Sequence, residues 1–153
     1  MNKVLSVADF GAVSGGEVLC TAAIQAAVDA AACGDTVLIP AGVWLSGAVF
    51  LHSDMTLRFE QGAELRGTND ESCYTILRTR VSGVEMDWPA GLVNANDCEN
   101  LCICGPGVIN GQGEYWWRKY WGGPEDHEEG GMRKWYRAKG LMGFLDFDCL
   151  RVR

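Results

Sequence analysis

The chain opens with one segment of helical period. Apolar residues recur at spacings of three and four, among them Ile24 and Val28, and form one stripe on a helix over about residues 21–32. Thr21 can cap the N-terminus of this helix, and Gly34 follows where a left-handed residue commonly ends one. Alanine dominates the segment, so we expect a thin helix that lies close against other structure.

Beyond the helix the pattern changes to short extended runs of about three to five residues, each ended by glycine, proline or asparagine. No helices alternate with these runs, which excludes a doubly wound sheet and leaves a sandwich, a barrel or a solenoid. The predicted strands are residues 36–39, 44–46, 48–51, 55–59, 63–65, 92–93, 101–104 and 108–109.

Two stretches share the same order of features. Residues 53–67 and 97–111 each run from a polar pair into a strand, then a glycine corner and a second short strand. This repetition indicates successive coils of one solenoid. A helix at one end suits that architecture, because the terminal repeats of a solenoid must be capped.

A different composition begins near residue 114. Tryptophan and tyrosine alternate with arginine and lysine through residues 114–139, around a polar, glycine-rich centre. We predict a long loop with an exposed acidic tip, and loops of this length are usually functional or mobile.

Composition and charge narrow the function classes. The chain has 153 residues, 48% hydrophobic and 22% charged, which is typical of a folded soluble chain. Thirteen basic against twenty acidic residues give a net charge of −7, which disfavours nucleic acid or an anionic membrane as a partner. No apolar run approaches the roughly 18 residues of a membrane-spanning helix. The apolar stretch at the N-terminus is too short for the apolar region of a secretory signal. We therefore expect a cytoplasmic protein without membrane contact.

Seven cysteines invite a metal or disulfide interpretation. The count is odd, which favours free thiols in a reducing compartment. Cys98, Cys102 and Cys104 are close in sequence, but Cys102 and Cys104 flank Ile103 in a predicted strand, share one face, and are expected to pack as small hydrophobic residues. We predict no metal site and no cofactor.

The order of motifs resembles a known family. Asp-Phe-Gly-Ala at 9–12 and residues 21–31 resemble the opening of the pectin-lyase-like right-handed parallel β-helix proteins. The continuation resembles glycoside hydrolase family 28, the polygalacturonases and their relatives, which hydrolyse pectin. The motifs that carry it are Ile-Pro-Ala-Gly at 39–42, Leu-Ser-Gly at 45–47, Leu-His-Ser at 51–53, Thr-Leu at 56–57, Gly-Ala-Glu-Leu at 62–65 and Ile-Asn-Gly-Gln-Gly-Glu-Tyr-Trp-Trp at 109–117.

The resemblance implies an all-β fold, a right-handed parallel β-helix whose N-terminal helix caps the first coil. Residues 1–153 would be the N-terminal portion of a single such domain. It also implies inverting hydrolysis of galacturonan, in which two carboxyl groups stand about 6.5–9.5 Å apart. The family marks its catalytic coils with Asn-Thr-Asp, Asp-Asp, Gly-His-Gly and Arg-Ile-Lys segments, and none occurs here. We therefore assign no catalytic residue, expect this chain to be inactive alone, and expect the uncovered last coil of a truncated stack to promote association.

The implied partner is a pectic oligo- or polysaccharide, bound together with coils that this sequence lacks. Aromatic rings stack on sugars and arginines pair with carboxylates, so the candidate substrate-binding residues are Trp117, Arg118, Arg133 and Arg137. In the alternative, Trp117 anchors the loop by packing and the arginines pair with acidic residues of the same stretch.

Other charged residues have simpler interpretations. Asp146 and Asp148 would share one face of an extended segment, but a solvated face explains them as well as acid–base chemistry does. His52 is expected to be a structural, hydrogen-bonded histidine, and Glu64 a solvated turn residue. Arg78 and Arg80 are expected to be ordinary surface residues.

Two rival functions remain open. The first is a non-catalytic carbohydrate-binding or structural β-helix module. The second is a β-elimination lyase on the same scaffold, which would need a cluster of carboxylates for Ca²⁺ that the sequence does not display.

Overall fold

The computed structural model describes residues 2–81 and 84–116, without the side chains of residues 81 and 84. The chain forms two compact units. Among the described residues, the first runs to Tyr74 and resumes at Gly91–Gly111, and the second holds residues 75–90 and 112–116. No helix among the described residues is long and apolar enough to cross a membrane.

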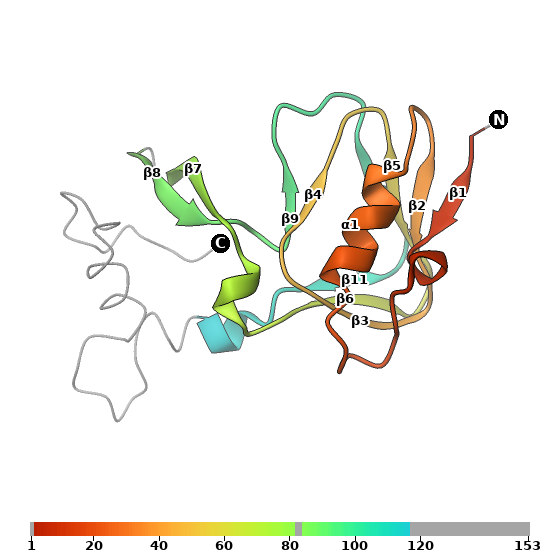
Figure 1. The fold of residues 1–153 in the computed structure, drawn as a ribbon, viewed down its shortest axis with the longest axis horizontal. Helices are drawn as coiled ribbons and strands as arrows, with labels where there is room; N and C mark the ends of the chain where they lie inside the picture. Colours follow the sequence, from red (N-terminus) through yellow and green to blue (C-terminus); the bar gives the residue numbers. More distant parts are fainter. Residues whose placement is uncertain (1, 82–83, 117–153) are drawn as a thin grey trace. The chain divides into compact units, whose positions relative to one another are not determined.

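The first unit is built from short strands and one α-helix (Figure 1). Its elements are β1 (Val4–Ser6), the 3-10 helix η1 (Val7–Phe10), α1 (Thr21–Asp29), β2 (Thr36–Ile39), β3 (Gly42–Ser46), β4 (Val49–Leu51), β5 (Thr56–Phe59), β6 (Ala63–Gly67), η2 (Glu71–Cys73), β9 (Val93–Ala95), β10 (Cys102–Cys104) and β11 (Val108–Asn110). The predicted strands are confirmed, and the structure adds β1.

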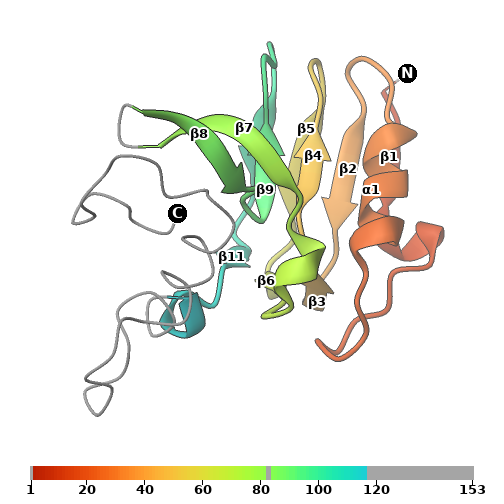
Figure 2. The ribbon, with the colours of Figure 1, turned by 60° about the vertical axis from the view of Figure 1, so that its left-hand side comes forward.

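Every strand pair in this unit is parallel. One sheet has the order β1-β2-β5-β10, a second the order β11-β6-β3, and a third pairs β4 with β9. Two successive turns, β2-β3-β4 and β5-β6-β9, each contribute one strand to each of the three sheets, which is the arrangement of a parallel β-helix. Figure 2 shows β1, β2 and β5 following one another along the first sheet.

The predicted repeat is confirmed by the register. Thr56 pairs with Cys102, and Leu65 with Ile109, so the two repeated stretches lie on consecutive coils. Their corners also match: Asn100 donates to Asp54 Oδ1 at 2.8 Å, and both residues have a positive φ. Asparagine and aspartate tolerate that conformation better than other non-glycine residues.

Apolar side chains of successive coils stack inside the first unit. Val37 of β2 pairs in register with Leu57 of β5, and both are almost fully buried. In the second sheet Trp44 pairs with Leu65, which is buried as well. Burying a side chain of this size contributes about 1.5–3 kcal/mol, so these ladders hold the coils together.

Helix α1 ends at Asp29, earlier than the predicted boundary near residue 32. Thr21 does not cap it, because its hydroxyl instead accepts a 2.7 Å hydrogen bond from the Gly47 amide. Gly34 does have the predicted left-handed φ of +84°, but it lies in the turn before β2, where its amide donates to the Asp54 carbonyl.

One polar side chain of α1, Gln25, completes the edge of the third sheet at Phe50. Gln25 accepts from the Phe50 amide at 2.8 Å and donates to the Phe50 carbonyl at 2.9 Å, which are the two bonds that a neighbouring strand would make. The helix therefore satisfies the exposed edge of β4, as the predicted capping role requires.

The other end of the described stack is open. Ile103 of β10 and Ile109 of β11 continue the inward ladders, yet each is 46% exposed. The same inward position is about 1% exposed one coil earlier, at Leu57 and Leu65.

The second unit contains an antiparallel hairpin of β7 (Ile76–Val81) and β8 (Val84–Pro89). This hairpin is absent from the strands predicted from the sequence. Strict alternation through Val84-Glu85-Met86-Asp87-Trp88, after a Ser-Gly pair, is the signal that could have found it.

Candidate functional site

The predicted substrate-binding residues lie outside the described residues. Trp117, Arg118, Arg133 and Arg137 all fall beyond residue 116, so their role stays a prediction. Asp146 and Asp148 lie in the same part of the chain.

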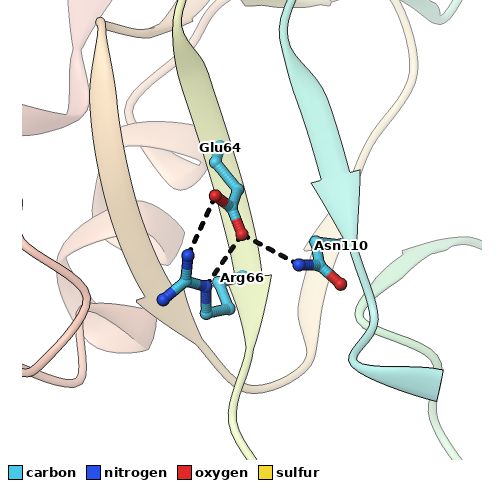
Figure 3. A network of polar contacts seen from close by, with 3 residues as sticks. All are labelled: Glu64, Arg66 and Asn110. Carbon is cyan, nitrogen blue, oxygen red and sulfur yellow. Dashed lines mark hydrogen bonds and ion pairs between the residues drawn. The ribbon is translucent and has the colours of Figure 1, made fainter. Parts of the chain in front are cut away.

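A polar network lies on the outer face of the second sheet (Figure 3). Arg66 donates to both carboxylate oxygens of Glu64, at 2.8 Å from Nε and 3.0 Å from Nη2. Asn110, one coil further on, donates to Glu64 Oε1 at 2.9 Å. The alternation of β6 places Glu64 and Arg66 on one face, and the coil register places Asn110 beside Arg66.

The network fixes the charge of its members. Hydrogen bonds from Arg66 and then Asn110 lower the pKa of Glu64, while the bond to Glu64 raises the pKa of Arg66. Glu64 is therefore held ionised and cannot act as the protonated acid that glycoside hydrolysis requires. Its interpretation as a solvated turn residue was wrong. Alternation in Ala-Glu-Leu-Arg-Gly at 63–67, together with the repeat, would have revealed this face.

His52 is a structural histidine, as predicted. Its Nδ1 lies 2.8 Å from the Ser53 carbonyl oxygen and its Nε2 lies 3.0 Å from the Val28 carbonyl oxygen. The ring thus joins the last turn of α1 to the corner after β4.

Two thiols contradict the packing expected for them. Cys102 and Cys104 share one face of β10, as predicted, but both are exposed rather than packed in a core. They pair in register with Thr56 and Arg58. No group of three or more histidine, cysteine, aspartate or glutamate side chains within the described ranges is arranged to hold a metal ion.

The arginines of the second unit face acidic residues of the same hairpin. Arg78 lies 3.6 Å from Asp87 and Arg80 lies 3.9 Å from Glu85, in exposed cross-strand pairs. Such exposed pairs contribute little to stability, so the two arginines behave as the ordinary surface residues that were predicted.

Comparison with curated proteins gives two clear relatives. No protein-family model matches the chain. It is 40% identical over 119 residues to an exo-poly-alpha-D-galacturonosidase of Dickeya chrysanthemi, which covers 72% of this chain and 20% of the relative. It is 34% identical over 129 residues to a probable polygalacturonase of Vitis vinifera, which covers 77% of this chain and 26% of the relative. The chain thus matches about a fifth to a quarter of these proteins' length.

Comparison with solved structures agrees. The family 28 exopolygalacturonase of Yersinia enterocolitica matches with a TM-score of 0.66 and 40% sequence identity, over 72% of this chain and 21% of that protein. The parallel sheets, the helix on the edge of the stack and the sequence motifs all lead to the same conclusion. Over about a fifth to a quarter of their length, this chain is similar to proteins of glycoside hydrolase family 28, the polygalacturonases.

Proposed function

We propose that this chain supplies the first coils of a polygalacturonase-type hydrolase that acts on pectin from chain ends. The observation that carries the proposal is the 40% identity, over 72% of this chain, to an exo-poly-alpha-D-galacturonosidase. The edge of β4 supports the placement at one end of a longer β-helix, because the Gln25 side chain of α1 already occupies the backbone groups of Phe50.

The role of these coils is scaffolding rather than acid–base chemistry. Inverting hydrolysis needs a protonated carboxylic acid on the leaving oxygen and a carboxylate that activates water. Glu64 fits neither part, because Arg66 and Asn110 occupy its oxygens. The two catalytic carboxyl groups belong to coils that carry the family's catalytic segments, which this sequence does not contain.

Substrate recognition is the second part of the proposal. Galacturonan carries one carboxylate per sugar, and guanidinium groups pair with carboxylates in a planar, two-pronged geometry. Arg118, Arg133 and Arg137 would hold these carboxylates, and Trp117 would stack on a sugar ring.

A chimera tests the proposal. The matched segment of the Dickeya chrysanthemi enzyme is replaced by this chain, and sugar release from polygalacturonate is followed by product chromatography. We expect short products released from the start of the reaction with little fall in viscosity, as in exo cleavage. A folded chimera without activity, or one that gives a random ladder of oligomers, would contradict the proposal.

Arginine variants of the chimera test recognition. Replacing Arg118, Arg133 and Arg137 by glutamine should raise KM by at least about tenfold, since a hydrogen bond to a charged group contributes about 1.5–3 kcal/mol. The matched control is Arg78→Gln with Arg80→Gln, because these arginines already face Asp87 and Glu85. Equal KM values for the two sets would rule out the predicted binding residues.

The rival binding module makes a different prediction for the chain alone. It requires the isolated chain to bind oligogalacturonate at calorimetrically measurable affinity. If the isolated chain binds and the chimera is inactive, the module is the better account.

A further inference from the structure

Strand β10 carries two exposed thiols on one face. Cys102 and Cys104 lie on the outer face of the first sheet, on either side of Ile103, whose inward register partner is Leu57. Residues two apart on a strand have Cα atoms about 6.7 Å apart and near-parallel side chains. Both thiols therefore project from the same face of one strand.

The spacing disfavours a disulfide between them. Disulfides usually join Cα atoms about 4.4–6.8 Å apart, so an intrastrand bridge at this spacing would sit at the long end of the range. A metal ion bound between the two sulfur atoms does not require the Cα atoms to lie so close together.

The number and type of coordinating atoms determine which metal ion can bind. Structural zinc requires four ligands, and hard cations require oxygen. Here, in the part of the chain that the structure describes, no third histidine, cysteine, aspartate or glutamate joins the two thiols. Cys98 lies nearby in sequence, but its thiol is directed to the carbonyl oxygens of Leu51 and Asn96.

The charge beside the two thiols favours a monovalent cation. Arg58 is the register partner of Cys104 on the adjacent strand. Two thiolates around a monovalent cation carry a net charge of −1, and the guanidinium of Arg58 would offset that charge. Soft thiolate pairs favour Cu⁺ among biological cations.

We propose that Cys102 and Cys104 form a two-sulfur binding site for a soft monovalent cation of the Cu⁺ type, with Arg58 as its counter-charge. Each thiol gives up one proton on binding, so one Cu⁺ releases two protons and forms two Cu–S bonds without a change of oxidation state. Because each thiol must lose its proton to bind the cation, affinity should increase with pH.

Competition with a chromophoric chelator tests the site. The full 153-residue chain is reduced with a phosphine under nitrogen and titrated with Cu⁺ against bathocuproine disulfonate. We expect one tightly bound Cu⁺ per chain, with two sulfur neighbours by X-ray absorption. Cys102→Ser and Cys104→Ser should each weaken binding by roughly 10²–10⁴-fold, because the second sulfur binds intramolecularly.

Controls separate ligation from folding. Cys33→Ser removes an exposed thiol elsewhere and should leave binding unchanged. Cys104→Met keeps a soft sulfur and should retain part of the affinity, and Arg58→Gln should weaken binding about two- to fivefold. Absence of Cu⁺ binding by the reduced chain, full affinity in Cys102→Ser and Cys104→Ser, or tighter binding of Zn²⁺ than of Cu⁺ would overturn the proposal.

Discussion

At the residue scale, the carboxylate of Asp35 closes the turn between α1 and β2. The residue is 5% exposed, and it accepts from the Lys3 amide at 2.7 Å and from the Ala32 amide at 3.0 Å. These backbone hydrogen bonds, that of Lys3 first, lower the pKa of Asp35 below its ordinary value of 3.8. One short side chain thus ties Lys3, just before β1, to Ala32 in the turn after α1.

Replacement of Asp35 by asparagine should destabilise the fold in a pH-dependent way. Because the folded pKa is depressed, the contribution of Asp35 is present above pH 3.8 and is lost as the pH falls through the folded pKa. We expect Asp35→Asn to lower the melting temperature at pH 7 by on the order of 5 °C. The deficit should shrink toward pH 3.

Melting curves by circular dichroism between pH 2.5 and 7 measure this difference. Asp97→Asn, at an exposed position, controls for the loss of one negative charge. A deficit for Asp35→Asn that is the same at every pH would contradict the assignment.

Gly105 occupies a position where no other residue fits. Its φ is +105°, and an added Cβ would meet the carbonyl oxygen of Phe59 in the preceding coil. Gly105→Ala should therefore cost at least about 2–4 kcal/mol of unfolding free energy. Gly111→Ala is the matched control, because nothing lies within 4 Å of its added Cβ and its φ is not positive. Equal urea midpoints for the two variants would show that the coils can separate at Gly105.

At the element scale, Gln25 lets a helix act as the neighbour of a strand. Its side-chain amide makes both backbone bonds of Phe50. Gln25→Leu keeps the size of the side chain but leaves these partly buried groups unpaired, so it should cost about 1–3 kcal/mol of unfolding free energy, measured by urea unfolding. Asp29→Ala removes only the exposed bond from Gln25 to Asp29, and should change stability by less than about 0.5 kcal/mol. If Gln25→Leu and Asp29→Ala lower the unfolding free energy equally, Gln25 does not cap the edge of β4.

The helix and the strands of the first unit were easier to predict from the sequence than the residues at which they end and the contacts made there. Apolar and polar residues alternate in β5, which predicts a strand. The same order of a polar pair, a strand and a glycine corner recurs in the next coil, which predicts the repeat. The use of the Thr21 hydroxyl for Gly47, rather than for its own helix, depends on a contact between distant residues. No local pattern encodes such a contact.

The candidate site also has features that the sequence predicts and features that depend on contacts between coils. The shared face of Cys102 and Cys104 follows from strand period, which is local. Their exposure depends on what covers β10, and the Glu64–Arg66–Asn110 network depends on the register between coils. Both are properties of the stack, so single-sequence patterning could suggest but not settle them.

At the scale of the whole molecule, the first unit is a stack whose stability is a sum over coils and their interfaces. The helix end is satisfied by side chains of α1, whereas the described end at β10 leaves Ile103 half exposed. A substitution should therefore cost more inside the stack than at that end, even when the side chains belong to the same ladder.

Leu57 and Ile103 allow that comparison within one ladder, since they are register partners with exposures of 1% and 46%. Leu57→Ala should cost about 2–5 kcal/mol of unfolding free energy, because it removes atoms that are packed on all sides. Ile103→Ala should cost less than about 1.5 kcal/mol, because water already reaches much of the side chain. Urea unfolding followed by tryptophan fluorescence gives both values. If Ile103→Ala costs as much as Leu57→Ala, another segment or another copy of the chain covers β10 in solution. Repeating the measurement at two protein concentrations separates these cases, since only a second copy makes the cost depend on concentration.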